Sequence, residues 1–394
     1  MTLTAAELPA PGPDASAASA ALSDVIAAEI AVCGGWISFA RYMELALYQP
    51  RLGYYAGGSH KFGAHDAGGD FLTAPELTPL FAQALARQVA QILAASSPLL
   101  IEAGAGSGRL AADLLPALAA LDCLPERYQI LELSGELRAR QQATLAAHAP
   151  DHADRVEWLD RLPERFSGCL IGNELLDAMP THALRWNDEA GEPAVLERGV
   201  GLIDGRLTVA ERPARGALLD AAQALQLQPP FRSEISLAAR AWVAELARRL
   251  ERGALLLIDY GLARHELYHP LRDGGTLRCH YRHRVHEDPF WFPGLSDITS
   301  HVDFTAVAEA GFDAGLEVLG YTSQANFLLN CGIGEMMQSQ KVGAGDTADL
   351  RARGAVNVLL SPNEMGELFK VIALGRGVPG PLLGFARGDR VHAL

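Results

Sequence analysis

The segment from Leu99 to Leu110 constrains the fold more than any other part of the chain. An apolar run ends at Glu102, glycines follow at positions 104, 106 and 108, and an amphipathic helix is predicted over 109–121. A strand, a tight glycine turn and a helix let bare backbone approach a nucleotide-like ligand. A dinucleotide fingerprint would need its third glycine at position 109, which is Arg109. The loop therefore predicts a nucleotide-like ligand other than a dinucleotide.

Strands and helices alternate after this loop, which predicts an α/β fold with a doubly wound, mostly parallel sheet. The expected strands are 99–102, 128–133, 156–159, 169–172, 254–260 and 316–321, and the expected helices include 135–147, 233–250, 304–310 and 326–338. Upstream, a helix is expected from 70 to about 93, with Thr73 as its cap and Glu76 three residues on.

The predicted organisation has six parts. They are a disordered lead-in (1–22), an N-terminal helical region with a glycine-rich lid (23–97), the first half of the ligand-binding domain (98–180), a β-hairpin insertion (181–232), the second half of that domain (233–325), and a C-terminal helix with a closing segment (326–394). Short alternating segments with Asn-Asp and Asp-Gly turns predict the hairpins. The glycine-rich passage 53–69 is either a lid or a surface linker.

Composition excludes several classes of protein. The net charge of −14 over 394 residues argues against a general nucleic-acid binder. Five scattered cysteines without a CxxC pair suggest neither a disulfide framework nor a zinc site. We find no apolar run long enough for a membrane span and no basic targeting segment, so a cytoplasmic protein is expected. His280, His283 and His286 recur at three-residue spacing without a carboxylate partner, so no metal site is expected.

Two strand ends carry candidate cofactor-binding acids. Ligands of open parallel sheets bind at the carboxyl ends of the strands. Glu132 ends the second strand, where a carboxylate can accept both hydroxyl protons of a ribose; the alternative is a solvent-facing glutamate. Asp160 follows the third strand and is either near an adenine edge or an ordinary turn residue.

The segment Asn173–Asp177 is the predicted transfer site. Glu174 and Asp177 could together bind a protonated acceptor and help to remove its proton. The alternative is that Asp177 caps a turn and Glu174 pairs with a core arginine. His301 and Asp303 could form an acid/base or substrate-positioning pair, although Asp303 could equally be the N-cap of its helix.

Several separate motifs along most of the chain are similar to the MidA-type family of class I methyltransferases, which use S-adenosylmethionine. They are Gly53-Tyr54-Tyr55, 70–76, the 102–108 loop, Glu132-Leu133-Ser134, 172–180, Asp259-Tyr260-Gly261, 293–304 and 324–328. Ala105 and Ser107 replace the usual proline and basic residue of the family loop. The resemblance implies a Rossmann-like fold and an acceptor site at Asn173, Glu174 and Asp177. The candidate cofactor-binding residues are Thr73, Glu102, Gly104, Gly106, Gly108, Glu132, Asp160 and Asn173.

This resemblance predicts a methyltransferase that modifies a protein side chain, namely arginine, for example on a subunit of respiratory complex I. The alternative is an assembly chaperone that binds S-adenosylmethionine and a partner protein without essential catalysis. A third interpretation, a nicotinamide oxidoreductase, is disfavoured by Arg109. The acceptor, a homodimeric state and the role of the hairpin insertion stay open.

Overall fold

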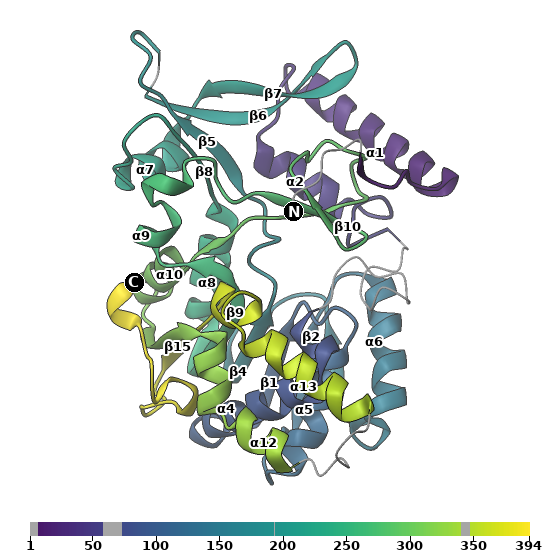
Figure 1. The fold of residues 1–394 in the computed structure, drawn as a ribbon, viewed down its shortest axis with the longest axis vertical. Coiled ribbons are helices and arrows are strands. Elements are labelled where there is room, and N and C mark those ends of the chain that lie inside the picture. Colours follow the sequence, from purple (N-terminus) through teal and green to yellow (C-terminus); the bar gives the residue numbers. More distant parts are fainter. Residues whose placement is uncertain (1–6, 58–72, 193, 340–346) are drawn as a thin grey trace. The chain divides into compact units, whose positions relative to one another are not determined.

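The computed structural model describes residues 7–57, 73–192, 194–339 and 347–394, and the chain separates into two compact units (Figure 1). The hairpin unit consists of Met1–Phe71, Asp177–Ala241 and Arg264–Asp303. The sheet unit consists of Leu72–Leu176, Trp242–Ala263 and Phe304–Leu394. Each unit is therefore assembled from three stretches that are distant in the sequence.

The sheet unit is built on one mixed sheet, with its strands in the order β14-β15-β9-β4-β1-β2-β3. The strands are β1 (Leu99–Ala103), β2 (Arg127–Leu131), β3 (Val156–Leu159), β4 (Phe166–Asn173), β9 (Leu250–Leu262), β14 (Glu317–Ser323) and β15 (Phe369–Arg376). The five strands from β9 to β3 are parallel, and β15 runs antiparallel to both of its neighbours. The predicted α/β class with a mostly parallel sheet is confirmed. The strand order reverses between β1 and β4, which is where such sheets bind ligands.

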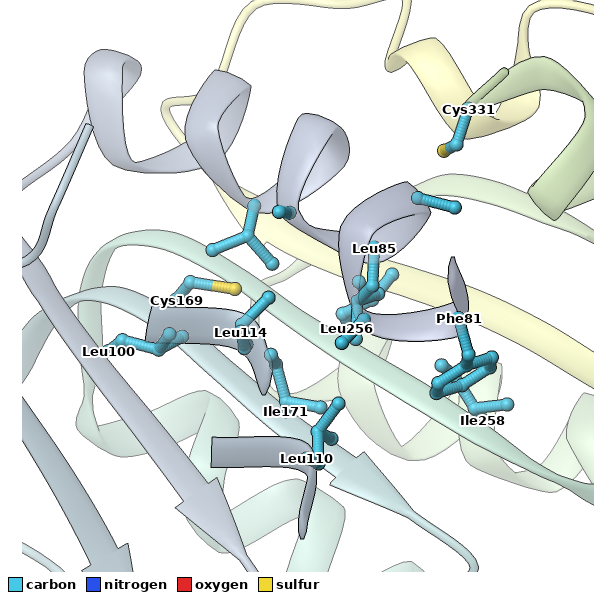
Figure 2. Packing of buried hydrophobic residues seen from close by; sticks show 14 of the residues in the cluster. Phe81, Leu85, Leu100, Leu110, Leu114, Cys169, Ile171, Leu256, Ile258 and Cys331 are labelled. Carbon is cyan, nitrogen blue, oxygen red and sulfur yellow. The ribbon is translucent and has the colours of Figure 1, made fainter. Parts of the chain in front are cut away.

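Apolar helix faces cover this sheet. The helices are α3 (Ala74–Leu77), α4 (Pro79–Ala95), α5 (Arg109–Ala119), α6 (Gly135–His148), η3 (Pro150–Arg155), α10 (Phe304–Asp313), α11 (Gln324–Asn330), α12 (Ile333–Ser339), α13 (Thr347–Leu360), α14 (Met365–Leu368), η5 (Leu383–Phe385) and η6 (Val391–Ala393). Figure 2 shows Leu85 of α4 and Leu114 of α5 in one cluster with Ile171 of β4 and Leu256 of β9, all fully buried. Each such side chain stabilises the fold by about 1.5–3 kcal/mol relative to exposure.

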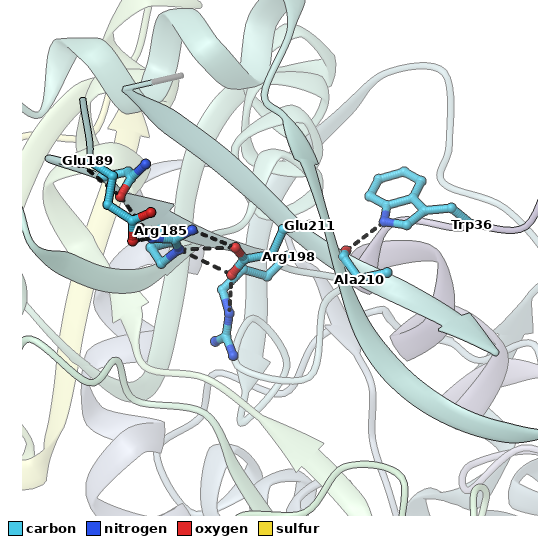
Figure 3. Close-up of polar contacts among 7 residues, drawn as sticks. Trp36, Arg185, Glu189, Arg198, Ala210 and Glu211 are labelled. Carbon is cyan, nitrogen blue, oxygen red and sulfur yellow. Dashed lines mark hydrogen bonds and ion pairs between the residues drawn. The ribbon is translucent and has the colours of Figure 1, made fainter. Parts of the chain in front are cut away.

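The hairpin unit contains two antiparallel sheets. Its elements are α1 (Pro13–Val32), α2 (Phe39–Tyr48), β5 (His182–Trp186), β6 (Val195–Ile203), β7 (Arg206–Pro213), α7 (Gly216–Ala224), β8 (Phe231–Ile235), α9 (Arg264–Leu267), η4 (Pro270–Arg272), β10 (Arg278–Tyr281), β11 (Arg284–His286), β12 (Asp297–Thr299) and β13 (Val302–Asp303); α8 (Leu237–Arg249) contains the boundary at Ala241. Strands β7-β6-β5-β8 form one sheet and β11-β10-β12 the other. In Figure 3 the Trp36 indole donates to the Ala210 carbonyl at 2.7 Å, and Arg185 pairs with Glu211 across the first sheet.

The prediction of a disordered lead-in over 1–22 is wrong from Pro13 onward, because α1 begins there. Proline suits the first helical turn, and Leu22, Ile26 and Ile30 lie in the buried core of the hairpin unit. By length and composition α1 could cross a membrane, contrary to the sequence-based expectation, with a mean hydropathy of 1.5. Packed core helices and signal sequences pass the same test, so this observation is weak evidence for a span.

Three predicted helices have different bounds. The helix expected from 70 to 93 is interrupted at Thr78, which is extended because the following Pro79 disfavours helical backbone before it; residues 70–72 lie outside the described part. The helix expected from 233 begins at Leu237, because Phe231–Ile235 pairs with β5 instead. The helix expected over 326–338 is divided into α11 and α12 at Gly332, whose φ is +83°.

The structure groups the chain differently from the six predicted parts. Residues 264–303 belong with the N-terminal helices and the hairpins, while α3 and α4 belong with the parallel sheet. The predicted hairpins exist, and the Asp204-Gly205 turn between β6 and β7 has positive φ at both residues. The segment that contains His280, His283 and His286 is the hairpin of β10 and β11. Much of the glycine-rich passage 53–69 lies outside the described residues.

Candidate functional site

The glycine loop connects β1 to α5 within the sheet unit. Gly104, Gly106 and Gly108 all have positive φ, at +71°, +52° and +82°. Residues other than glycine rarely adopt a backbone conformation with positive φ. At Gly108 a Cβ atom would also lie 2.9 Å from the Gln141 Cα of α6. Backbone conformation and close packing therefore both require glycine here, and the loop presents bare backbone at the N-terminus of α5.

Glu132 follows β2 on the same edge of the sheet. Its Oε1 accepts from the Ser134 backbone N–H at 2.8 Å, and its Oε2 accepts from the Gln141 amide at 3.2 Å. Burial raises the pKa of this carboxyl, and the hydrogen bonds from Ser134 and Gln141 oppose that effect. A carboxylate has about four acceptor positions. The backbone of Leu133 also bonds this carboxylate, and its remaining acceptor capacity is available to ribose hydroxyls.

Gln141 is a functional candidate that the sequence-based reasoning missed. Its side chain is fully buried on α6, and its amide donates to both the Gly106 carbonyl and Glu132. The available signal was its spacing, because Gln141 is four residues before Leu145, the other buried residue of α6. A glutamine on the buried stripe of a helix needs polar partners.

Asp160 lies after β3, and its side chain is 86% exposed. It pairs with Arg138 at 2.7 Å, and that guanidinium also donates to the carbonyls of Glu132 and Leu159. Arg138 thereby joins the ends of β2 and β3. The predicted role of Asp160 in ligand binding stays a prediction.

Glu102 is buried within β1 with 2% exposure. Its Oε2 accepts from the Tyr128 hydroxyl of β2 at 2.7 Å. Burial raises the pKa of Glu102 to about 7, although this hydrogen bond lowers it. The carboxyl of Glu102, which is predicted to contact the cofactor, is thus already hydrogen-bonded to Tyr128 on the neighbouring strand β2.

Asn173 is the last residue of β4 and Glu174 follows it. Both lie beside the glycine loop, because Ala103 pairs with Gly172 in parallel register. Glu174 has the unusual φ of +53° for a residue with a side chain. Its Oε1 accepts from the Asn173 amide at 3.1 Å and from the Ala74 backbone N–H at 3.4 Å. The buried Asn173 Oδ1 has no hydrogen-bond partner among the residues that the structure describes.

Asp259 on β9 holds the turn that follows Glu174. Its buried carboxylate accepts from the backbone N–H groups of Leu175 at 3.0 Å and Leu176 at 2.7 Å. These bonds stabilise a backbone that the left-handed Glu174 would otherwise strain. The Glu174 carboxylate thus contacts an amide and a backbone N–H, and its pairing with a core arginine stays an alternative.

Thr73 precedes α3 as its N-cap residue, but its side chain makes no capping hydrogen bond, so the predicted capping box is wrong. Glu76 instead accepts from the Ser107 hydroxyl of the glycine loop. This contact connects α3 to the loop. The predicted role of Thr73 in cofactor binding stays a prediction, and Glu76 has a different partner from the one expected.

Asp177, His301 and Asp303 belong to the hairpin unit. The backbone carbonyl of Asp177 accepts from the Ser300 N–H at 3.0 Å. The Asp177 carboxylate also helps to raise the pKa of the Tyr55 phenol, which burial and Asp297 raise more strongly. Asp303 pairs with Arg264 at 3.4 Å. The catalytic roles predicted for these residues stay predictions.

The described residues of the sheet unit fit a ligand that carries a nucleoside. The glycine loop offers backbone, Glu132 offers acceptors for a diol, and the orphaned Asn173 Oδ1 offers one more buried acceptor. Within the described part of the chain, no group of three or more His, Cys, Asp or Glu side chains could hold a metal ion.

Comparison with known proteins decides which nucleoside ligand this is. Residues 84–322 match the model of Methyltransf_28, described as "Putative S-adenosyl-L-methionine-dependent methyltransferase". The chain belongs to this family of MidA-type methyltransferases. It is therefore an S-adenosylmethionine-dependent methyltransferase, and S-adenosylmethionine is its cofactor.

Named relatives and solved structures agree with this assignment. A crystal structure of a COG1565 superfamily member from Burkholderia thailandensis, bound to S-adenosyl-homocysteine, has 53% sequence identity and a TM-score of 0.93, covering 98% of this chain and 100% of that one. The protein arginine methyltransferase NDUFAF7 of Danio rerio is 28% identical over 87% of this chain and 84% of its own length. Its Mus musculus counterpart is 28% identical over 86% and 81%.

Proposed function

We propose that this methyltransferase modifies an arginine side chain of a partner protein. The observation that carries the proposal is the position of Glu174, held at the end of β4 beside the glycine loop with its carboxylate oriented by Asn173 and Ala74. The relatives named protein arginine methyltransferase support this choice of acceptor. A subunit of respiratory complex I remains the acceptor that the family resemblance suggests.

The cofactor supplies an electrophilic methyl group on a positively charged sulfur. A guanidinium is nearly always protonated, so its nitrogen must lose a proton when it is methylated. The Glu174 carboxylate can bind this cation and accept that proton. Asp177 is three residues farther along the chain, and its predicted role as the second carboxylate rests on that spacing.

Labelling of a deletion-strain lysate tests this proposal. Purified enzyme and labelled S-adenosylmethionine are added to the lysate, and labelled proteins are identified by mass spectrometry. We expect a methyl group on an arginine of one partner protein. Label only on small molecules or on another side chain would contradict the proposal.

The variant Glu174→Gln separates catalysis from binding. It keeps the shape of the side chain but removes the base, so we expect bound cofactor and a loss of methyl transfer of about 10²- to 10⁴-fold. Glu251→Gln, at an exposed ion pair with Arg165, is the matched control and should transfer normally. If Glu174→Gln still methylates the partner at the wild-type rate, the catalytic role of Glu174 fails. If it matures the partner in cells without methylating it, the chaperone alternative gains support.

Location and assembly are separate proposals. The relatives from Danio rerio and Mus musculus are named as mitochondrial proteins, so the expected cytoplasmic location has no support in the comparisons and stays a prediction. A homodimer also stays a prediction. Size measurement in solution and fractionation of the source cells would test them.

A further inference from the structure

We propose that Gln141 is a positioning residue that holds the glycine loop and the Glu132 carboxylate in the arrangement that binds the cofactor. The Gln141 Nε2 lies 3.1 Å from the Gly106 carbonyl and 3.2 Å from the Glu132 Oε2. One amide therefore connects the loop after β1 to the acid after β2.

Trp158 fixes the orientation of this amide. The indole Nε1 of Trp158, on β3, donates to the Gln141 Oε1 at 2.8 Å. An indole N–H can only donate, and a carbonyl and a carboxylate can only accept. If the amide were flipped, its NH2 group would face the Trp158 N–H, and its oxygen would face the Gly106 carbonyl and the Glu132 carboxylate. Only the observed orientation satisfies them.

The backbone of α6 is equally constrained at this point. A Cβ atom on Gly108 would lie only 2.9 Å from the Cα of Gln141, so α6 contacts the loop directly. The side chain of Gln141 is fully buried, and its amide has no room to sample alternative partners. Loss of the amide would leave the Gly106 carbonyl and the Trp158 N–H without their partner.

Gln141 also affects the charge state of Glu132. The Gln141 amide is a neutral donor that stabilises the charged form of Glu132 and so opposes the effect of burial on its pKa. The charge of Arg138 on α6 also lowers the pKa of Glu132. Asp160, after β3, pairs with Arg138. Removing the amide should raise the Glu132 pKa further. Binding of a diol to the carboxylate would then need a higher pH.

Calorimetric titration with S-adenosyl-homocysteine tests this inference without any methyl acceptor. We expect Gln141→Leu to bind about tenfold more weakly, with the pH midpoint of binding shifted upward. Trp158→Phe, which removes only the orienting donor, should bind about threefold more weakly. In the double variant the loss should equal that of Gln141→Leu, because both changes act through one amide.

The matched control is Gln129→Leu. Gln129 is another buried glutamine of the sheet unit, and its amide donates to Glu157 at 3.0 Å. We expect the Tm of Gln129→Leu to fall, while its affinity for S-adenosyl-homocysteine and the pH midpoint of binding stay as in the wild type. Wild-type affinity in Gln141→Leu, or an equal loss in Gln129→Leu, would overturn the proposal. If Gln141→Leu does not fold, the test is made with Trp158→Phe. Wild-type affinity of Trp158→Phe for S-adenosyl-homocysteine would then overturn the proposal.

Because these measurements use the cofactor product alone, they are independent of the proposed arginine acceptor. Failure of the labelling experiment would leave the Gln141 result standing. Failure here would leave the choice of acceptor untouched.

Discussion

At the scale of single residues, burial of the Glu102 carboxyl makes the stability of the fold depend on pH. Its folded pKa of about 7 lies above the value of 4.5 for an exposed glutamate. Between these values the folded state holds a proton that the unfolded state has released, so stability falls as pH rises. Above the folded pKa the full penalty applies, which is about 3 kcal/mol for a shift from 4.5 to about 7.

We therefore expect Glu102→Gln to raise the Tm at pH 8 and to leave it nearly unchanged at pH 5. The amide can still accept from the Tyr128 hydroxyl but carries no charge to bury. Thermal melts at the two pH values measure the effect, with the exposed Glu164→Gln as control. An equal change of Tm at both pH values would show that the carboxyl is not protonated on folding.

At the scale of elements, the strand–loop–helix that begins at Leu99 was predicted from the sequence because its glycines and apolar periodicity are local signals. The strand at Val156–Leu159 was likewise predicted with its observed bounds. Residues 233–235 were mistaken for the start of a helix, because the extended form of Phe231–Ile235 depends on pairing with β5 about fifty residues earlier. The partners of Gln141 were missed for the same reason, since they come from three elements.

The loop makes a prediction of its own. Gly108→Ala should destabilise the protein by about 1–3 kcal/mol and weaken cofactor binding, because alanine disfavours φ of +82° and meets the Gln141 backbone. Gly135→Ala, at the first residue of α6 with nothing within 4 Å, is the control and should be neutral or slightly stabilising. Chemical denaturation of both variants measures this, and equal midpoints would refute the packing argument.

At the scale of the whole molecule, the sequence indicated the α/β class but not the composition of the two units. Alternating strands and helices are visible along the chain, whereas the insertion of β15 between β9 and β14 is a long-range pairing. The grouping of 264–303 with the N-terminal helices likewise depends on contacts between distant stretches. The 102–108 loop, Glu132-Leu133-Ser134 and 172–180 indicated one edge of the sheet, because each of them lies at the end of a parallel strand of that sheet.

The central claim is that the Glu102–Gly108 loop and Glu132 serve S-adenosylmethionine and not a dinucleotide. Calorimetric titration of the full-length chain with S-adenosylmethionine and, separately, with NAD tests it most directly. We expect saturable binding of one S-adenosylmethionine per chain and no heat of binding from NAD. Saturable binding of NAD without any binding of S-adenosylmethionine would contradict it.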